Sequence, residues 1–180
     1  MLKRIRKSSG KNGVGGHFAI VASKYNPSYV SGMLEAAEYC LRAAGVESLK
    51  IFRVPGAFEI PVVVTKLAQT HQPPLSAIIC LGVILRGQTS HAQHIAEAVS
   101  QALAQIQVRS GIPVIHEVLL LEGKEQAEAR CLSREHNRGV EAAQTALEMK
   151  QVMESLDKSV SPELLRKETT GGRIVAPKGC

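Results

Sequence analysis

The sequence predicts an α/β domain in which helices cover both faces of a four-stranded parallel sheet, giving a three-layer αβα sandwich. Short apolar or β-branched runs alternate four times with segments that carry apolar residues at helical spacing, and the connections between them are short. The third run, residues 75–82 (LSAIICLG), is almost entirely apolar, as expected for a central strand that is buried on both faces.

The elements follow one another along the chain. Residues 17–23 (HFAIVAS) form the first predicted strand, and Asn26 with Pro27 provides a cap and first turn for a helix that Gly45 ends. Residues 94–111 are the clearest amphipathic helix. We expect strands over 17–23, 49–54, 75–82 and 113–121, and helices over 29–45, 60–70, 94–111, 124–132 and 137–156. This order is typical of a flavodoxin-like single domain.

The basic charge of the chain lies in its two terminal segments. Residues 1–16 carry five basic residues and no acid, and residues 157–180 carry five basic and three acidic residues. Of the net charge of +6, this leaves residues 17–156 near −1. We expect a flexible basic arm over 1–16, one domain over 17–156 and a flexible tail over 157–180. A nucleic-acid partner would require a basic folded face with stacking aromatics, and is not expected.

The four cysteines, at 40, 80, 131 and 180, form no CxxC pair and show no metal-ligand spacing. Cys40 and Cys80 lie in apolar stretches, where a thiol usually packs as a small buried hydrophobe. We expect reduced thiols and no metal. The sequence shows no apolar signal segment and no apolar run long enough to span a bilayer, so we expect a cytoplasmic protein without a membrane partner.

Candidate functional residues follow the predicted strands at one edge of the sheet. Three short loops read SKYN (23–26), VPGAFE (54–59) and GVILRGQTSH (82–91), and HEVLL (116–120) lies on the fourth strand. The carboxyl ends of parallel strands meet at one edge, where α/β proteins bind their ligands. We therefore expect these residues to converge on one site.

The stretch LRGQTSH carries the features of an anion site beside a proton-transfer group. After the arginine, Gly87 permits close backbone approach, and the amides of Gln88 and Thr89 can face an anion where the next helix starts. The imidazole of His91 suits proton transfer near neutral pH. The alternative is a plain strand-to-helix turn capped by Thr89 or Ser90, with a solvated histidine. The loop lacks the Lys-Ser/Thr ending of a P-loop, and there is no GxGxxG to cradle a dinucleotide.

Other residues near this loop each have a functional and a structural interpretation. Tyr25 could stack on a heteroaromatic ring or stand at the rim of the site. Phe58 and Glu59 could cover a planar ring and bind a polyol or an amine, or else fill the core and cap the following helix. Arg130 and Arg138 could bind phosphate or be ordinary surface residues of helices.

Taken in order, these motifs resemble the lumazine synthase family. SKYN, RVPGAFEIP, LGVILRGQTSH, GIPVIHEVL, EQAEAR and HNRGVEAAQTALEM follow one another over residues 17–156 without an obvious gap. The combination of VPGAFEIP with a G-[QE]-T-x-H loop is specific to that family. The resemblance implies a flavodoxin-like fold and assembly into homopentamers, or into icosahedral shells built from pentamers.

The resemblance also implies an enzyme of riboflavin biosynthesis. The family condenses 5-amino-6-(ribitylamino)uracil with 3,4-dihydroxy-2-butanone 4-phosphate to form 6,7-dimethyl-8-ribityllumazine, and releases phosphate and water. It needs no cofactor and no metal. Each site lies between neighbouring subunits, and the shell-forming members imply riboflavin synthase as a candidate cargo.

The resemblance assigns roles residue by residue. His91 matches the histidine that shuttles protons, and Arg138 matches a position often held by lysine, which gives it a supporting role. Gln88, Thr89 and Arg130 match the groups that bind the phosphate. Arg130 and the residue at 116 would complete the site of a neighbouring subunit. The residues that match the pyrimidine and ribityl pocket are Tyr25, Asn26, Ala57, Phe58, Glu59, Val83, Ile84, Leu85 and His116.

Several positions depart from the family pattern. His116 stands where the family usually has phenylalanine, and Glu117 and Leu120 replace glycine and threonine. Gln93 and His94 replace an acid and an aromatic residue. These departures leave open a catalytically weak paralogue that binds lumazine or flavin, and a shell-forming container protein. An unrelated phosphate-binding flavodoxin-like protein would fit the topology but not the ordered motifs.

Overall fold

The structure, a computed structural model, describes residues 13–159 and divides into two compact units, one up to Lys150 and one from Gln151. Of the second unit, the described part is the C-terminal end of one helix. The expectations for 1–12 and 160–180 lie outside the described residues.

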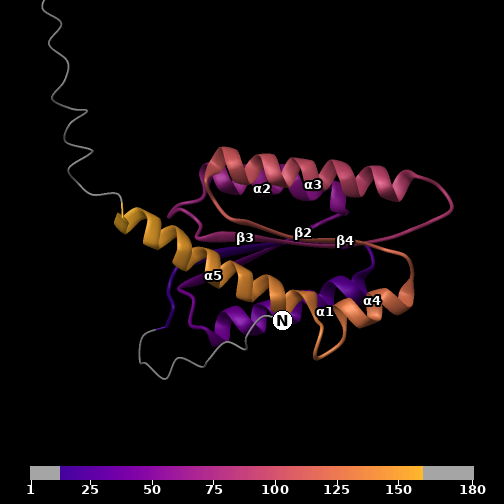
Figure 1. Cartoon of the computed structure of the whole chain (residues 1–180), viewed down its shortest axis with the longest axis horizontal. Coiled ribbons are helices and arrows are strands. Elements are labelled where there is room, and N and C mark those ends of the chain that lie inside the picture. Colours follow the sequence, from indigo (N-terminus) through magenta and orange to yellow (C-terminus); the bar gives the residue numbers. More distant parts are fainter. Residues whose placement is uncertain (1–12, 160–180) are drawn as a thin grey trace, which may run out of the picture. The chain divides into compact units, whose positions relative to one another are not determined.

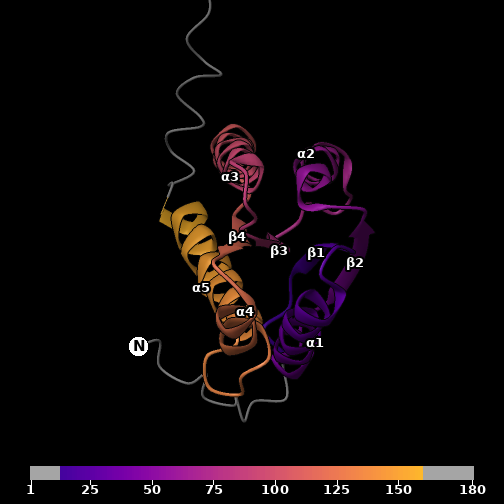
Figure 2. The same ribbon diagram turned by 90° about the vertical axis from the view of Figure 1, so that its right-hand side faces the viewer.

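The first unit is built around a parallel sheet with the strand order β2-β1-β3-β4. Helices α2 and α3 cover one face, and α1, α4 and the part of α5 up to Lys150 cover the other (Figures 1 and 2). The strands are β1 (His17–Ser23), β2 (Ser48–Val54), β3 (Ala77–Leu85) and β4 (Val114–Leu121). The helices are α1 (Pro27–Ala43), η1 (Ala57–Glu59), α2 (Ile60–Thr70), α3 (His91–Ser110), α4 (Lys124–Cys131) and α5 (Arg138–Ser159). The predicted α/β class, with a four-stranded parallel sheet between helices, is confirmed.

Residues 13–16, which the sequence assigns to the basic arm, are bound to the turn after α1. The backbone amide of Val14 donates to the Ala44 carbonyl at 3.0 Å, and that of Gly15 donates to the Gly45 carbonyl at 3.1 Å. Gly45 has a φ of 74°, which favours glycine, so the expected end of α1 has its physical basis here.

Strand β3 begins two residues later and ends three residues later than the predicted strand 75–82. Residues 83–85, expected in the following loop, pair with residues 119–121 of β4. The run of leucines at the end of β4 supplies an apolar neighbour that a local sequence pattern cannot reveal. Helix α3 also begins earlier than expected, so His91 is its first residue.

The strands therefore end at different heights. Ala22 pairs with Leu81, and β1 ends one residue later, whereas β3 continues to Leu85. At about 3.3 Å per residue, β3 and β4 reach roughly 10 Å beyond β1. We call residues 83–85 and 119–121 the β3–β4 extension. At the carboxyl edge of the sheet, this extension projects beyond the ends of β1 and β2 and lies next to the loops that follow them.

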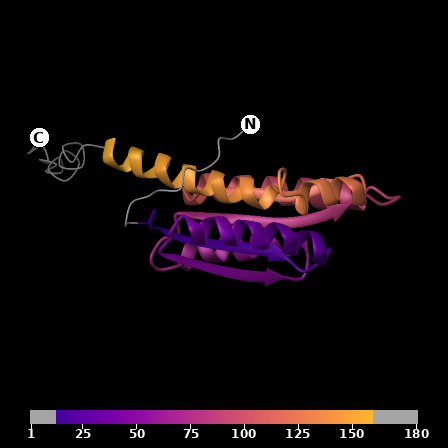
Figure 3. The same cartoon turned by 90° about the horizontal axis from the view of Figure 1, so that it is seen from below.

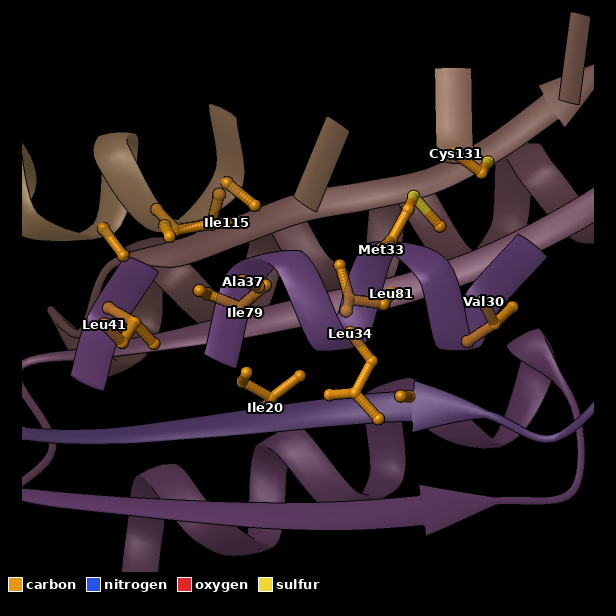
Figure 4. Close-up of a cluster of buried hydrophobic side chains, with 14 of the residues drawn as sticks. Ile20, Val30, Met33, Leu34, Ala37, Leu41, Ile79, Leu81, Ile115 and Cys131 are labelled. Carbon is orange, nitrogen blue, oxygen red and sulfur yellow. The ribbon is translucent and has the colours of Figure 1, made fainter. Parts of the chain in front are cut away.

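Each face of the sheet has its own apolar core. On the α1 face, Met33, Ala37 and Leu41 of α1 pack over Ile79 of β3 and other strand residues (Figure 4). A second cluster of buried apolar residues lies between the sheet and the helices α2 and α3. Because the central strands are buried on both faces, they carry uninterrupted apolar runs rather than alternating ones.

Helices α1 and α5 approach each other closely at glycine. Figure 3 shows α1 lying along the strands, with α4 and the part of α5 up to Lys150 next to it. A Cβ atom added to Gly139 at the start of α5 would lie 2.0 Å from the carbonyl oxygen of Met33. The preceding Asn137 fixes this contact, since its side-chain amide donates to the carbonyls of Cys131 at 2.7 Å and Gly32 at 3.3 Å.

Replacing Gly139 by alanine should therefore destabilise the fold strongly. The Cβ atom collides with backbone, which cannot rotate away, so we expect the free energy of unfolding to fall by about 3 kcal/mol. Urea unfolding measures it. The matched control is Gly123→Ala, because a Cβ at Gly123 meets nothing within 4 Å. Equal effects of the two substitutions would contradict the close approach.

Candidate functional site

An open hollow of about 340 Å³ lies at the carboxyl edge, beside the loop that joins β3 to α3 at the right-hand end of Figure 1. The predicted anion-binding residues Gln88 and Thr89 line it, and the N-terminus of α3 begins beside it. The full lining is Arg86, Gly87, Gln88, Thr89, Ser90 and Gln93. A helix of 20 residues that starts beside this hollow adds a partial positive charge to it.

The loop shows features of both interpretations that the sequence left open. The His91 amide donates to the Thr89 hydroxyl oxygen at 3.4 Å, so Thr89 makes a long capping contact. Ser90, the residue before α3, makes no side-chain capping bond. His91 is exposed at the start of the helix. The contact between Thr89 and the His91 amide therefore does not close the hollow, and the imidazole of His91 stays accessible to solvent.

Two aromatic rings stand exposed at the same edge of the sheet. Tyr25 follows β1 and is 71% exposed, and Phe58 follows β2 and is 61% exposed. The alternative that Phe58 fills the core is therefore wrong. Exposed rings on neighbouring loops are a chemically suitable surface for a planar ligand.

Glu59 has a local structural role. Its Oε2 atom accepts a hydrogen bond at 2.8 Å from the amide of Gly56, which closes the turn that precedes α2. The predicted alternative, that Glu59 caps the start of the helical segment, is thus present in the structure. Ala57 between them is buried. Phe58 points outward because the residues on either side of it are held in place, Ala57 by burial and Glu59 by its hydrogen bond with Gly56.

Asn26 joins the end of β1 to the β3–β4 extension. Its side-chain amide donates to the carbonyl of Val83 at 2.9 Å. Its φ of 52° lies in the left-handed region, which asparagine tolerates better than most residues. The expected capping bond from its side chain to α1 is not made. Ile84 and Leu85, which follow Val83, are half-buried.

His116 is engaged inside its own chain. Its Nδ1 accepts from the amide of Val118 at 3.3 Å, and its Nε2 lies 2.8 Å from the Ser100 hydroxyl. The Ser100 hydroxyl donates to the carbonyl of Ala96 at 2.7 Å, so the consistent assignment puts the proton of a neutral His116 on Nε2. Burial lowers the pKa of His116, and a backbone hydrogen bond opposes part of that effect. The ring thus links β4 to α3.

Glu117, the next residue, links β4 to α5 on the other face. The guanidinium of Arg138 donates to both carboxylate oxygens of Glu117, at 2.9 and 3.0 Å, and also pairs with Glu141. Burial raises the pKa of the Glu117 carboxyl, and the hydrogen bonds and charge of Arg138 counter part of that effect. Arg130 on α4 is exposed and also lowers this pKa through its charge.

The structure brings some predicted site residues together and leaves others apart. The three loops follow strands at the same carboxyl edge, but only the loop after β3, with Gln93 of α3, lines the hollow. Arg130 and Arg138 lie on α4 and α5, on the other face of the sheet from α3, and His116 contacts Ser100 of α3. Sequence reasoning did not assign Arg86 or Gln93, which line the hollow. The arginine of the loop motif was the signal for Arg86, and the departure from the family pattern at position 93 was the signal for Gln93. Among residues 13–159, no group of three His, Cys, Asp or Glu side chains could hold a metal ion, and no helix is long and apolar enough to cross a membrane.

The fold and these residues define a flavodoxin-like α/β protein with a candidate anion site at the carboxyl edge of its sheet. The sequence profile described as 6,7-dimethyl-8-ribityllumazine synthase matches residues 15–154. A 6,7-dimethyl-8-ribityllumazine synthase of Xanthomonas oryzae pv. oryzae (strain PXO99A) is 39% identical over 141 residues, which are 77% of this chain and 90% of that protein. One of Halorhodospira halophila (strain DSM 244 / SL1) is 39% identical over 142 residues, 78% of this chain and 90% of that protein. The chain belongs to the 6,7-dimethyl-8-ribityllumazine synthase family.

The engagement of His116 predicts a pH dependence of stability. Burial lowers the folded-state pKa of His116 below the ordinary value for histidine of about 6.5, so the unfolded chain binds the proton more readily. Stability should therefore fall as the pH drops below about 6.5, by at most about 1.4 kcal/mol per pH unit from this residue. Urea unfolding between pH 8 and pH 5 should show a shallower decline for His116→Phe. An unchanged slope in His116→Phe would refute the assignment.

Proposed function

We propose that this chain condenses 5-amino-6-(ribitylamino)uracil with 3,4-dihydroxy-2-butanone 4-phosphate to 6,7-dimethyl-8-ribityllumazine. The observation that carries the proposal is the meeting of the three loop motifs at one sheet edge, beside a hollow at the start of α3, in a member of this family. The reaction forms an imine with loss of water, expels inorganic phosphate, closes the ring and loses a second water. It uses no cofactor and no metal.

The pyrimidine and the ribityl chain bind along the loops after β1 and β2 and against the β3–β4 extension. Tyr25 stacks on the ring, and the exposure of its own ring supports this role. Asn26, with the turn at 57–59, places polar and apolar groups beside the ring and the polyol. Val83 and the two residues after it line the wall of the pocket.

The phosphate binds at the amides of Gln88 and Thr89, and Arg130 neutralises its charge. His91 moves protons while the imine forms and the phosphate leaves. Much of the remaining rate acceleration comes from holding the two substrates in a reactive orientation. Arg138 supports the site through Glu117, with which it shares two hydrogen bonds.

The complete site forms between neighbouring subunits of a homopentamer, to which Arg130 and the region of residue 116 contribute from the next subunit. The unpaired edges of the sheet support an oligomer. The outer edges of β2 and β4 pair with no strand among residues 13–159, and unpaired edges invite another chain. Pentamers, or icosahedral shells built from them with riboflavin synthase as cargo, are the assemblies we propose for this protein of the cytoplasm.

A second candidate, a paralogue that binds lumazine or flavin without making it, is favoured by the engagement of His116 within its own chain. An absorbance assay for lumazine formation, on protein whose size is measured by light scattering, separates the two. Product above the uncatalysed rate supports the synthase. Folded oligomers that bind flavin and form no product would favour the paralogue.

Replacing His91 by alanine should lower kcat by roughly a hundredfold or more while both substrates still bind, because the proton shuttle is lost. Steady-state kinetics measure this. His94→Ala is the matched control, since His94 is exposed one turn further along α3. Unchanged turnover in His91→Ala would remove His91 from the mechanism.

Replacing Arg130 by alanine should raise KM for the butanone phosphate about tenfold, since a hydrogen bond to a charged group contributes roughly this much to binding. KM for the pyrimidine should change little. The exposed Arg134 offers a control with the same change of charge near α4. An effect confined to the pyrimidine would contradict the assignment.

A further inference from the structure

Arg86 is the one charged side chain among the described residues that line the hollow. It follows β3 directly, and its backbone amide donates to the carbonyl of Leu121 at 2.8 Å, which continues the β3–β4 extension by one bond. Its position is therefore set by the sheet rather than by the loop.

The guanidinium of Arg86 is held from two sides. Its Nε lies 3.1 Å from Oε1 of Glu122, and its Nη2 donates to Oε1 of Gln93 at 3.2 Å. The hydrogen bond to Gln93 uses one of the five N–H donors of a guanidinium, and the contact with Glu122 is an ion pair. The side chain remains 47% exposed, and Glu122 is 61% exposed, so water screens their ion pair.

Gln93 suits this position because it is an amide. Its oxygen accepts from Arg86, and its nitrogen donates to Oε1 of Glu97, one helical turn later, at 2.6 Å. A carboxylate at 93 could not donate to Glu97 and would repel it. The amide holds Arg86 at the hollow without adding a second negative charge beside the guanidinium.

We propose that Arg86 is the cation with which each chain binds the phosphate group in its own hollow, and that Gln93 is its positioning residue. The inference rests on the proposed function and adds a residue to its phosphate site. Arg130 lies on α4, near Glu117 and Arg138, and does not line this hollow. Arg86 is therefore the side-chain charge that the hollow receives from its own chain.

The first test compares wild type, Arg86→Gln and Arg86→Lys. Calorimetry measures the binding of inorganic phosphate, and kinetics measure KM for each substrate. Arg86→Gln should weaken phosphate binding and raise KM for the butanone phosphate, each roughly tenfold, with little change in KM for the pyrimidine. Arg86→Lys should recover part of the loss, because lysine keeps the charge but not the planar fork.

Arg109→Gln is the matched control. It removes the same charge from the last turn of α3, roughly 27 Å along the helix axis from His91. Near-UV circular dichroism checks that each variant keeps the native packing. Equal phosphate affinities of Arg86→Gln and Arg109→Gln would overturn the proposal.

A double-mutant cycle tests the role of Gln93. Gln93→Glu should weaken phosphate binding in wild type and do so less in the Arg86→Gln background, because the added carboxylate acts partly by neutralising Arg86. The same loss in both backgrounds would overturn the positioning role.

The outcomes also separate this inference from the proposed function. Arg86-dependent phosphate binding in a protein that forms no lumazine would contradict the proposed function but keep this inference. Full activity and phosphate affinity in Arg86→Gln would overturn this inference and leave the function standing.

Discussion

The hydrogen bond from the Asn26 side chain to the Val83 carbonyl is the contact on which the candidate site depends. Strands β3 and β4 continue beyond β1, so the Val83 carbonyl has no neighbour on β1 to pair with. A buried carbonyl without a partner is costly, and Asn26 supplies the partner from the loop after β1. The same bond fixes the loop that presents Tyr25. The shape of the sheet edge and the position of the first loop therefore have one cause.

The fourth strand is tied to helices on both faces by consecutive polar residues. Successive side chains of a strand point to opposite faces, so His116 reaches Ser100 on α3 and Glu117 reaches Arg138 on α5. Removing one member of either contact leaves a partly buried polar group without its partner. Two of the three departures from the family pattern on this strand, His116 and Glu117, thus have partners within the chain. They fix the edge strand from which the β3–β4 extension continues.

The sequence was sufficient for the class of fold, because apolar runs and helical periodicity reflect burial that local patterns record. It could not place the end of β3, since residues 83–85 become strand only through pairing with β4. Nor could it decide between two interpretations of Glu59 or locate the partners of His116, because the amide of Gly56 and the hydroxyl of Ser100 enter through three-dimensional contacts. The loop motifs identified the edge that holds the candidate site. They included the arginine at position 86, but its contacts with Glu122 and Gln93 arise only in three dimensions.

The weakness of the contacts that hold Arg86 is what makes this residue suitable for an anion that must bind and leave. A solvent-exposed ion pair contributes about 0–1 kcal/mol. A phosphate that replaces Glu122 as the partner of the guanidinium therefore costs little free energy in the lost ion pair. Arg138 is the opposite case, since the buried carboxylate of Glu117 holds it by two hydrogen bonds and a second carboxylate, that of Glu141, also pairs with it. Withdrawing Arg138 from that network would leave the Glu117 charge buried and unpaired, at a cost of several kcal/mol. The two arginines therefore have different duties, one fixing a strand to a helix and the other remaining available at the hollow.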